Sequence, residues 1–203
     1  MSRLRDFGML MLALMVACGP GGASDPAEQV LAEATGQPVR PFSTREFGRE
    51  RYDGARSVLV DPEQAEPLLA DIRARLPAGY VAFIGTIHSL ADPPAQGTEL
   101  VVAPGSNQFE ILRVAASDAV NYGLSTSDLV DELQAWDREL GIDIYQASTD
   151  SITLRLKKVP DPLPEFAARV YRFCPDIVDQ GLGDIEALQE QIRQEQMLDL
   201  WWD

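Results

Sequence analysis

The only histidine of this 203-residue chain, His88, has a serine beside it and an aspartate four positions later, Ser89 and Asp92. Histidine transfers protons at neutral pH, and a Ser-His-Asp triad uses it to activate serine for hydrolysis. In such triads the three side chains converge from separate positions and the serine lies on a strained turn. Here all three share one loop, so we predict no catalytic residue. A hydrolase that uses His88 with a carboxylate remains an alternative.

The other reactive side chains favour structural roles. Cys174 ends an apolar helical face just before a proline, so we expect a buried cysteine that behaves as a small hydrophobic residue. Asp176, Asp179 and Asp184 lie close together, but they lack the alternating acidic pattern and closing glutamate of a calcium-binding loop. One histidine and two cysteines exclude a zinc site built from several imidazoles or thiolates. We therefore expect neither a metal nor a cofactor.

Two polar connections, residues 118–123 and 175–183, are the better candidates for binding. Both are rich in Asp, Asn, Gln and Gly, and each joins well-defined elements. Functional groups concentrate on loops that a rigid scaffold positions. The candidate partner-binding surface consists of Asn121, Tyr122, Asp176, Asp179 and Gln180. This hypothesis requires that Tyr122 and Asp179 lie on the same side of the domain.

One helix, Thr126–Leu140, organises the half of the chain that carries these connections. Ser125 is a good N-cap residue, and Asp128 stands where the acid of a capping box belongs. Leucines and a tryptophan recur at i, i+4, i+7 and i+11, which places them on one face. Gly141 then ends the helix.

The remaining pattern alternates strands and amphipathic helices. The expected strands lie at 58–60, 80–87, 98–103 and 109–115, in a hairpin from 142 to 157, and at 198–202. The expected helices lie at 27–34, from 62 to about 76, at 126–140, from 163 to 174, and from 185 onward. We therefore predict an α+β fold, with a mixed, largely antiparallel sheet and helices packed on it. The order of elements in the C-terminal half is ferredoxin-like with one extra helix.

The N-terminus has the features of a secretory signal. Arg3 and Arg5 precede an apolar run, 7–17, whose 11 residues are too few for a membrane span of about 20. The segment Leu14–Gly19 resembles the lipobox of bacterial lipoproteins. This resemblance implies cleavage before Cys18 and attachment of lipid to its sulfur. Because glycine follows the cysteine, it favours the outer membrane; in a bacterium with a single membrane the anchor would lie in the plasma membrane.

The charge balance limits the possible partners. Without residues 1–17 the chain has 15 basic and 31 acidic residues, a net charge of −16. Such a surface repels phosphate backbones, so we expect no nucleic-acid partner. The same charge favours a basic protein partner or serves only solubility.

Four short motifs suggest a family. Residues 121–125 (NYGLS), 136–137 (WD), 173–181 (FCPDIVDQG) and 200–203 (LWWD) resemble an uncharacterised bacterial family, domain of unknown function 4253. The resemblance implies no activity and no catalytic residue.

These observations divide the chain into a lipoprotein signal peptide (1–17), a flexible tether (18–26), a mostly irregular segment (27–57) and a single α+β domain (58–203), of which 99–203 resembles the family. Our leading hypothesis is a lipid-anchored protein of the bacterial envelope with a non-catalytic, acidic interaction domain. The first alternative is an immunity-like protein that neutralises a basic toxin.

Overall fold

One seven-stranded sheet holds the chain together in the computed structural model, which describes residues 25–42, 54–85 and 97–203. Its strands are β1 (Arg40–Pro41), β2 (Arg56–Val60), β3 (Tyr80–Ile84), β4 (Thr98–Pro104), β5 (Ile142–Ala147), β6 (Ser151–Leu156) and β7 (Met197–Trp201). They lie in the order β1-β2-β4-β3-β5-β6-β7, and every neighbouring pair is antiparallel except β3 and β5. The predicted class, α+β with a mixed and largely antiparallel sheet, is confirmed.

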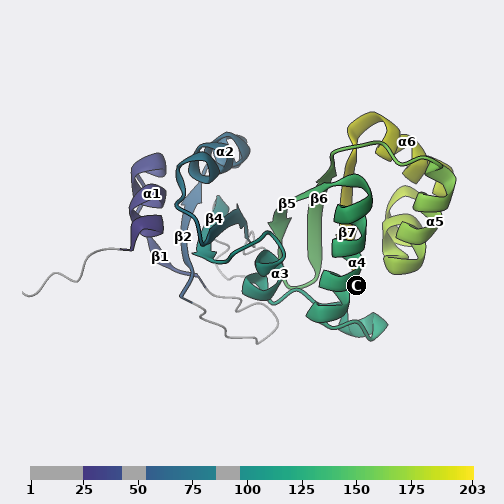
Figure 1. Cartoon of the computed structure of the whole chain (residues 1–203), viewed down its shortest axis with the longest axis horizontal. Coiled ribbons are helices and arrows are strands. Elements are labelled where there is room, and N and C mark those ends of the chain that lie inside the picture. Colours follow the sequence, from purple (N-terminus) through teal and green to yellow (C-terminus); the bar gives the residue numbers. More distant parts are fainter. Residues whose placement is uncertain (1–24, 43–53, 86–96) are drawn as a thin grey trace, which may run out of the picture.

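Helices cover both faces of this sheet (Figure 1). The α-helices are α1 (Pro26–Thr35), α2 (Ala65–Arg75), α3 (Glu110–Ala115), α4 (Thr126–Leu140), α5 (Leu163–Phe173) and α6 (Ile185–Glu195). The short 3-10 helices η2 (Pro62–Gln64) and η3 (Val120–Tyr122) and the π-helix η4 (Ile177–Leu182) join them. No helix among these residues is long and apolar enough to cross a membrane.

The central strands feed two hydrophobic cores, because successive side chains of a strand point to opposite faces. Ala82 and Ile84 join a core that α1 and α2 complete with Leu31 and Ile72. Phe83, between them in sequence, joins the larger core on the opposite face. The larger core is built with α3, α4, α5 and α6. A chain of edge-to-face aromatic contacts connects three of its elements, with ring centroids 5.3–5.4 Å apart, through Trp136, Phe166, Phe173 and Trp202.

Helix α4 has the predicted bounds and the predicted caps. The Ser125 hydroxyl accepts a hydrogen bond from the Asp128 amide at 3.4 Å, and the Asp128 carboxylate accepts one from the Ser125 amide at 2.8 Å. Gly141 follows with a φ of 68°, a conformation that glycine adopts without steric cost. Trp136 is completely buried, so the apolar stripe faces the core.

The predicted strand at 109–115 is wrong, because this segment forms helix α3. The Asn107 side chain accepts a hydrogen bond from the Phe109 amide at 3.0 Å and so starts the turn. The buried positions 111, 112, 114 and 115 follow helical spacing. The apolar alternation that suggested a strand covers too few positions to distinguish the helical period from the strand period. The ferredoxin-like order therefore lacks its first strand, and β7 pairs directly with β6.

Two further segments are more regular than expected. Residues 176–183 were expected to be irregular, but most of them form η4, which the bond from the Gly183 amide to the Val178 carbonyl (2.8 Å) closes. The segment 27–57 was expected to be mostly irregular apart from a helix at 27–34. That helix forms as α1, whose Leu31 is fully buried, and the segment also contributes β1 and the start of β2. The hairpin, the helix after residue 163, the helix capped by Asp184 and the last strand agree with the predictions.

Candidate functional site

A buried carboxylate, Asp176, joins the two polar connections that the sequence indicates. Its Oδ1 atom accepts hydrogen bonds from the Tyr122 hydroxyl at 2.6 Å and from the Gln180 amide at 2.9 Å. Its Oδ2 atom accepts one from the backbone amide of Asp203 at 2.9 Å. Only 3% of Asp176 is exposed, so each bond satisfies an acceptor that water does not reach freely. The residue fixes the loop of η3, helix η4 and the end of β7 relative to one another.

The charges of this cluster are consistent with its hydrogen bonds. Removal from water raises the pKa of Asp176, but the bonds from Tyr122, the Asp203 amide and Gln180 lower it, and its net shift is downward. The same bond, with desolvation and the nearby carboxylates, raises the pKa of Tyr122 to about 12. At neutral pH the pair is therefore a charged acceptor with a neutral donor, the arrangement that strengthens a hydrogen bond.

Two local structures position Tyr122 and its neighbours. An isolated bridge closes the loop of η3 through reciprocal backbone bonds between Ala119 and Leu124, at 2.9 and 3.1 Å. On η4, Asp179 accepts a hydrogen bond from the Tyr171 hydroxyl at 2.9 Å. Val120 and Tyr122, 67% and 40% exposed, are two of the three large hydrophobic side chains that project most from the described residues.

The structure brings most of the predicted surface together. Tyr122 and Gln180 bind the same carboxylate, and the exposed Asp179 directly precedes Gln180 on η4, so these residues lie on the same side. Asn121 is exposed beside Tyr122. Asp176 itself is buried, so it supports the surface and does not form it. Below, the Tyr122 surface means the exposed residues Val120, Asn121, Tyr122, Asp179 and Gln180.

The sequence reasoning did not include Val120, the most exposed member of this surface. The available signal was a valine within an otherwise polar connection. Periodicity gives no information in a three-residue helix, and the exposure follows from the bridge that turns the loop outward.

Cys174 is buried, as expected, and its sulfur contacts the Trp201 carbonyl oxygen at 3.0 Å. Burial raises the pKa of its thiol to about 11, so the thiol stays protonated at neutral pH. A protonated and inaccessible sulfur is a poor nucleophile. The structural role predicted for this cysteine agrees with that environment.

The other candidate residues lie elsewhere. His88, Ser89, Asp92 and Cys18 fall outside the residues that the structure describes. Among the described residues, no group of three or more His, Cys, Asp or Glu side chains is placed to hold a metal ion. The hydrolase alternative thus stays an untested prediction.

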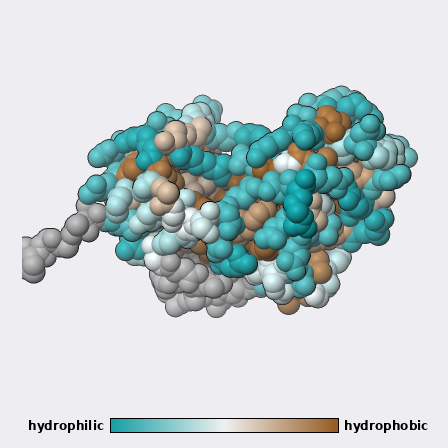
Figure 2. Space-filling view, viewed as in Figure 1, coloured by the Kyte–Doolittle hydropathy of each residue, from teal (hydrophilic) through white to brown (hydrophobic). Residues whose placement is uncertain are grey.

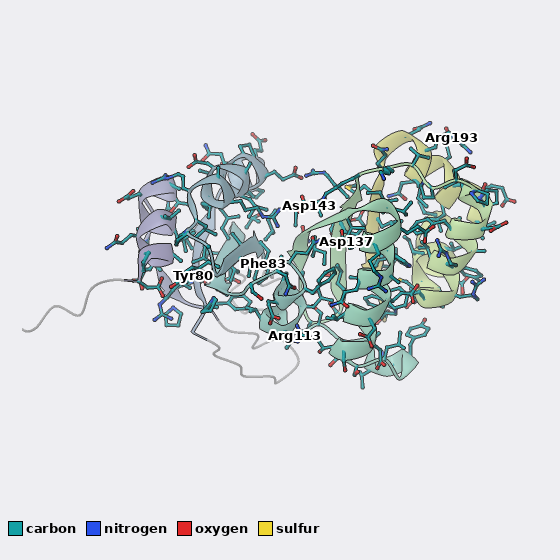
Figure 3. All side chains as sticks on the ribbon, viewed as in Figure 1. Tyr80, Phe83, Arg113, Asp137, Asp143 and Arg193 are labelled. Atoms are coloured by element: carbon teal, nitrogen blue, oxygen red, sulfur yellow. The ribbon has the colours of Figure 1, made fainter. Side chains whose placement is uncertain are left out.

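A cleft of about 960 Å³, which sequence reasoning missed, opens where the sheet divides between β3 and β5. These parallel strands pair only through Ile84 and Gln146, near their ends. Toward their beginnings they separate, and the cleft occupies the space between the two halves of the molecule (Figure 3). Figure 2 shows hydrophobic side chains in the middle of an otherwise largely hydrophilic face, between α2 and α4.

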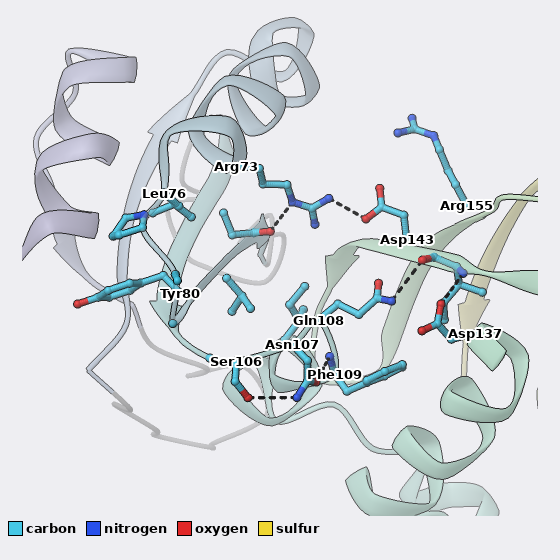
Figure 4. A pocket seen from close by; sticks show the side chains of 18 of the residues that line it. Arg73, Leu76, Tyr80, Ser106, Asn107, Gln108, Phe109, Asp137, Asp143 and Arg155 are labelled. Carbon is cyan, nitrogen blue, oxygen red and sulfur yellow. Dashed lines mark hydrogen bonds and ion pairs between the residues drawn. The ribbon is translucent and has the colours of Figure 1, made fainter.

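Two side chains replace the missing strand pairing along β5 (Figure 4). The Gln108 amide donates to the Ile142 carbonyl at 3.2 Å and accepts from the Ile144 amide at 2.9 Å. The Arg73 guanidinium donates to the Ile144 carbonyl at 2.6 Å, to the Ala82 carbonyl at 2.8 Å and to the Asp143 carboxylate at 2.9 Å. These bonds satisfy buried backbone groups, so the cleft does not depend on a ligand to remain open.

Comparison with known proteins gives one match. The family model described as Domain of unknown function (DUF4253) matches residues 99–203, just over half of the chain. No curated protein and no solved structure matches this chain. The matched segment includes Tyr122, Asp176 and the terminal strand, and thus the whole network described above. The chain therefore belongs to the DUF4253 family.

Proposed function

We propose that this protein is a lipid-anchored component of the bacterial envelope whose acidic, non-catalytic domain binds a basic protein partner through the Tyr122 surface. The observation that carries the proposal is the exposure of Val120 and Tyr122 on a closed loop that Asp176 joins to η4, the helix that carries Asp179. Exposed apolar side chains that polar groups surround are typical of protein interaction sites.

The architecture of the surface favours binding over chemistry. Tyrosine contributes strongly to protein interfaces because its ring buries a large apolar area and its hydroxyl keeps a polar contact. Asp176 already holds this ring in place, so binding would cost little conformational entropy. The net charge of −15 over the whole chain would accelerate encounter with a basic partner and select against acidic ones.

The anchoring part of the proposal rests on Cys18 and its lipobox-like context. Replacing this residue (Cys18→Ser) removes the sulfur that would carry lipid. The variant should leave the membrane fraction and incorporate no labelled fatty acid, whereas the wild type should stay in the membrane fraction and incorporate the label. A wild-type protein that fractionates with the soluble proteins and carries no fatty acid would refute the anchor.

The binding surface is tested with a photoreactive amino acid at position 120 or 121 of the full-length protein in cells. Both positions should give the same discrete crosslinked adduct, with a partner whose isoelectric point is above neutral. A second exposed valine, Val159 (43% exposed), lies outside this surface and provides the control site.

A matched pair of substitutions decides whether the adduct is specific. Val120→Asp should abolish the adduct formed from position 121, because it places a charge at the apolar centre of the surface. Val159→Asp should leave the adduct unchanged. The proposal fails if both variants crosslink like the wild type or if position 159 gives the same adduct.

An inhibitor that neutralises a basic toxin is the second candidate, and the large acidic excess favours it. In that case a basic protein encoded beside this chain should be toxic when expressed alone. Coexpression of the wild type should relieve the toxicity, and coexpression of the Val120→Asp variant should not. Absence of toxicity would leave interaction without inhibition as the function.

A further inference from the structure

We infer that the cleft between β3 and β5 binds a small zwitterion with an apolar group, of the class of free amino acids and short peptides. This site is separate from the Tyr122 surface and does not depend on the proposed function. The inference rests on the shape of the cleft, on two charged side chains in it, and on its apolar wall.

The size and rigidity of the cleft fit a small ligand. Its volume, about 960 Å³, is at the upper end of the range for small-molecule sites, about 300–1,000 Å³. Arg73 and Gln108 already satisfy the backbone groups of β5 that face it. A ligand would thus enter a formed site and would not have to replace strand pairing.

Most charged groups that line the cleft already have partners. Arg73 pairs with Asp143 at 2.9 Å. Arg155 pairs with Glu66 at 2.6 Å and lies over the Tyr145 ring, 4.3 Å from its centroid. Their charges are largely compensated, so they define the walls of the cleft and do not select the charge of a ligand.

Lys157 and Asp137 are different, since neither takes part in an ion pair with any residue that the structure describes. The Oδ1 atom of Asp137 accepts a hydrogen bond from the Ile142 amide at 2.8 Å. Its Oδ2 atom has no hydrogen-bond donor among the residues that the structure describes. The stem of Lys157 packs against Gly141, and its backbone amide donates to the Gly141 carbonyl at 2.9 Å. The Gly141 amide in turn donates to the Asp137 carbonyl at 2.9 Å, so both side chains flank this glycine.

The wall on the side of the N-terminal half is apolar. Leu76 and Val81 line it, and Figure 4 shows Leu76 across the cleft from Asp137 and Asp143. The Tyr80 ring is directed away from Asp137 and Asp143, toward α1, where its hydroxyl donates to the Asp25 carboxylate at 3.1 Å (Figure 4). The apolar wall is therefore formed by Leu76 and Val81.

A zwitterion uses all three features at once. Its carboxylate would meet the Lys157 ammonium, its ammonium would meet the free oxygen of Asp137, and its apolar group would contact Leu76 and Val81. An anion would leave Asp137 uncompensated, and a cation would leave Lys157 uncompensated. Asp137 is partly exposed and Lys157 is exposed, so each charge contributes a modest part of the affinity.

The test is titration calorimetry of the full chain in detergent with four defined probes. L-phenylalanine and glycyl-L-phenylalanine carry both charges, at shorter and longer separation. N-acetyl-L-phenylalanine lacks the ammonium group, and L-phenylalaninamide lacks the carboxylate. At least one zwitterion should bind, and about five- to tenfold more tightly than either blocked form. Whichever zwitterion binds more tightly identifies a free amino acid or a peptide as the ligand class.

Three variants assign the charges. Lys157→Gln should weaken the zwitterion about fivefold and leave phenylalaninamide unchanged. Asp137→Asn keeps the acceptor for the Ile142 amide and should weaken the zwitterion while leaving the acetylated probe unchanged. Lys158→Gln removes the adjacent exposed lysine, which does not line the cleft, and should change nothing. The inference is overturned if no zwitterion binds at millimolar concentration, if the blocked probes bind equally well, or if Lys157→Gln and Lys158→Gln have equal effects.

Discussion

The Asp176 carboxylate organises its surroundings because its three hydrogen-bond donors come from different parts of the chain. Tyr122 lies 54 residues away and Asp203 lies 27 residues away. The pKa of Asp176 is below its ordinary value of about 3.9, so the unfolded chain binds its proton more readily. Ionised Asp176 therefore stabilises the fold at neutral pH, and this stabilisation is lost as the pH falls below about 4.

The opposite sign applies to Tyr122, whose pKa is raised from 10 to about 12. The folded state holds this proton more tightly, so its contribution is complete below pH 10 and is lost as the pH rises from 10 to 12. We expect Tyr122→Phe to be less stable than the wild type at pH 7, since Asp176 loses a donor. Between pH 10 and 12 the variant should lose stability less steeply. Urea denaturation at pH 7, 10 and 12 measures both effects; parallel curves for the two proteins would contradict the assignment.

Gly181 packs so closely against the Trp201 indole that a larger residue does not fit without a displacement. A Cβ atom added there would lie 2.5 Å from Cη2 of Trp201, and the backbone of this glycine is not in the left-handed region. Gly181→Ala should therefore destabilise by displacing the indole, by about 1–3 kcal/mol. Denaturation of Gly181→Ala, Trp201→Phe and the double variant gives the coupling. The smaller ring should recover part of the loss, and strictly additive effects would show that the contact is unimportant.

At the scale of elements, β7 depends on strict alternation. Leu198, Leu200 and Trp202 are almost completely buried, while the residues between them are partly exposed. The strand pairs with β6 over five residues, and the Trp202 indole donates to the Phe173 carbonyl at 3.0 Å. The last strand thus closes the larger core and holds α5 against the sheet.

Substitutions on the two faces of β7 should therefore differ sharply. Leu200→Ala opens a cavity in the core and should cost about 2–5 kcal/mol in the free energy of unfolding. Asp199→Ala, on the partly exposed face of the same strand, should stay within about 0.5 kcal/mol of the wild type. Thermal and urea denaturation compare the two. Similar losses for both variants would mean that β7 contributes through its backbone pairing and not through burial.

At the scale of the whole molecule, the matched segment and the folding unit have different boundaries. The match to the DUF4253 family begins at Glu99, inside β4. In the sheet, β4 lies between β2 and β3, and both neighbours precede the matched segment. Residues 100–103 of β4 are buried on both faces. Without its neighbours this strand would expose its backbone groups and two apolar faces, which favours aggregation.

We therefore expect the fragment 99–203 to aggregate or to unfold without cooperativity when it is expressed alone. The fragment 25–203, which contains β2, β3 and the buried Leu31 of α1, should unfold in one cooperative transition. Far-ultraviolet circular dichroism with thermal melting, together with size-exclusion chromatography, distinguishes the two outcomes. A soluble 99–203 fragment that melts like the longer chain would show that the family segment is an autonomous domain.

The sequence alone specified the elements whose signals are local. Ser125, Asp128 and Gly141 mark the ends of α4 through their own side-chain or backbone chemistry, and the alternation in β7 reports one buried face. Both were predicted correctly. The polar connections were also recognisable as a candidate surface, since Asn, Asp and Gly gather there, although the use of that surface by a partner stays a prediction.

Only the tertiary structure decided the properties that depend on distant partners. Phe109 to Ala115 has too few apolar positions to distinguish a strand from a helix, and packing in the larger core selected α3. The burial of Asp176 and the exposure of Val120 depend on where the chain places its end and its loops. The cleft exists because β3 and β5 pair only at Ile84 and Gln146, 62 residues apart in the sequence, and separate toward their first residues. No pattern within either strand encodes that separation.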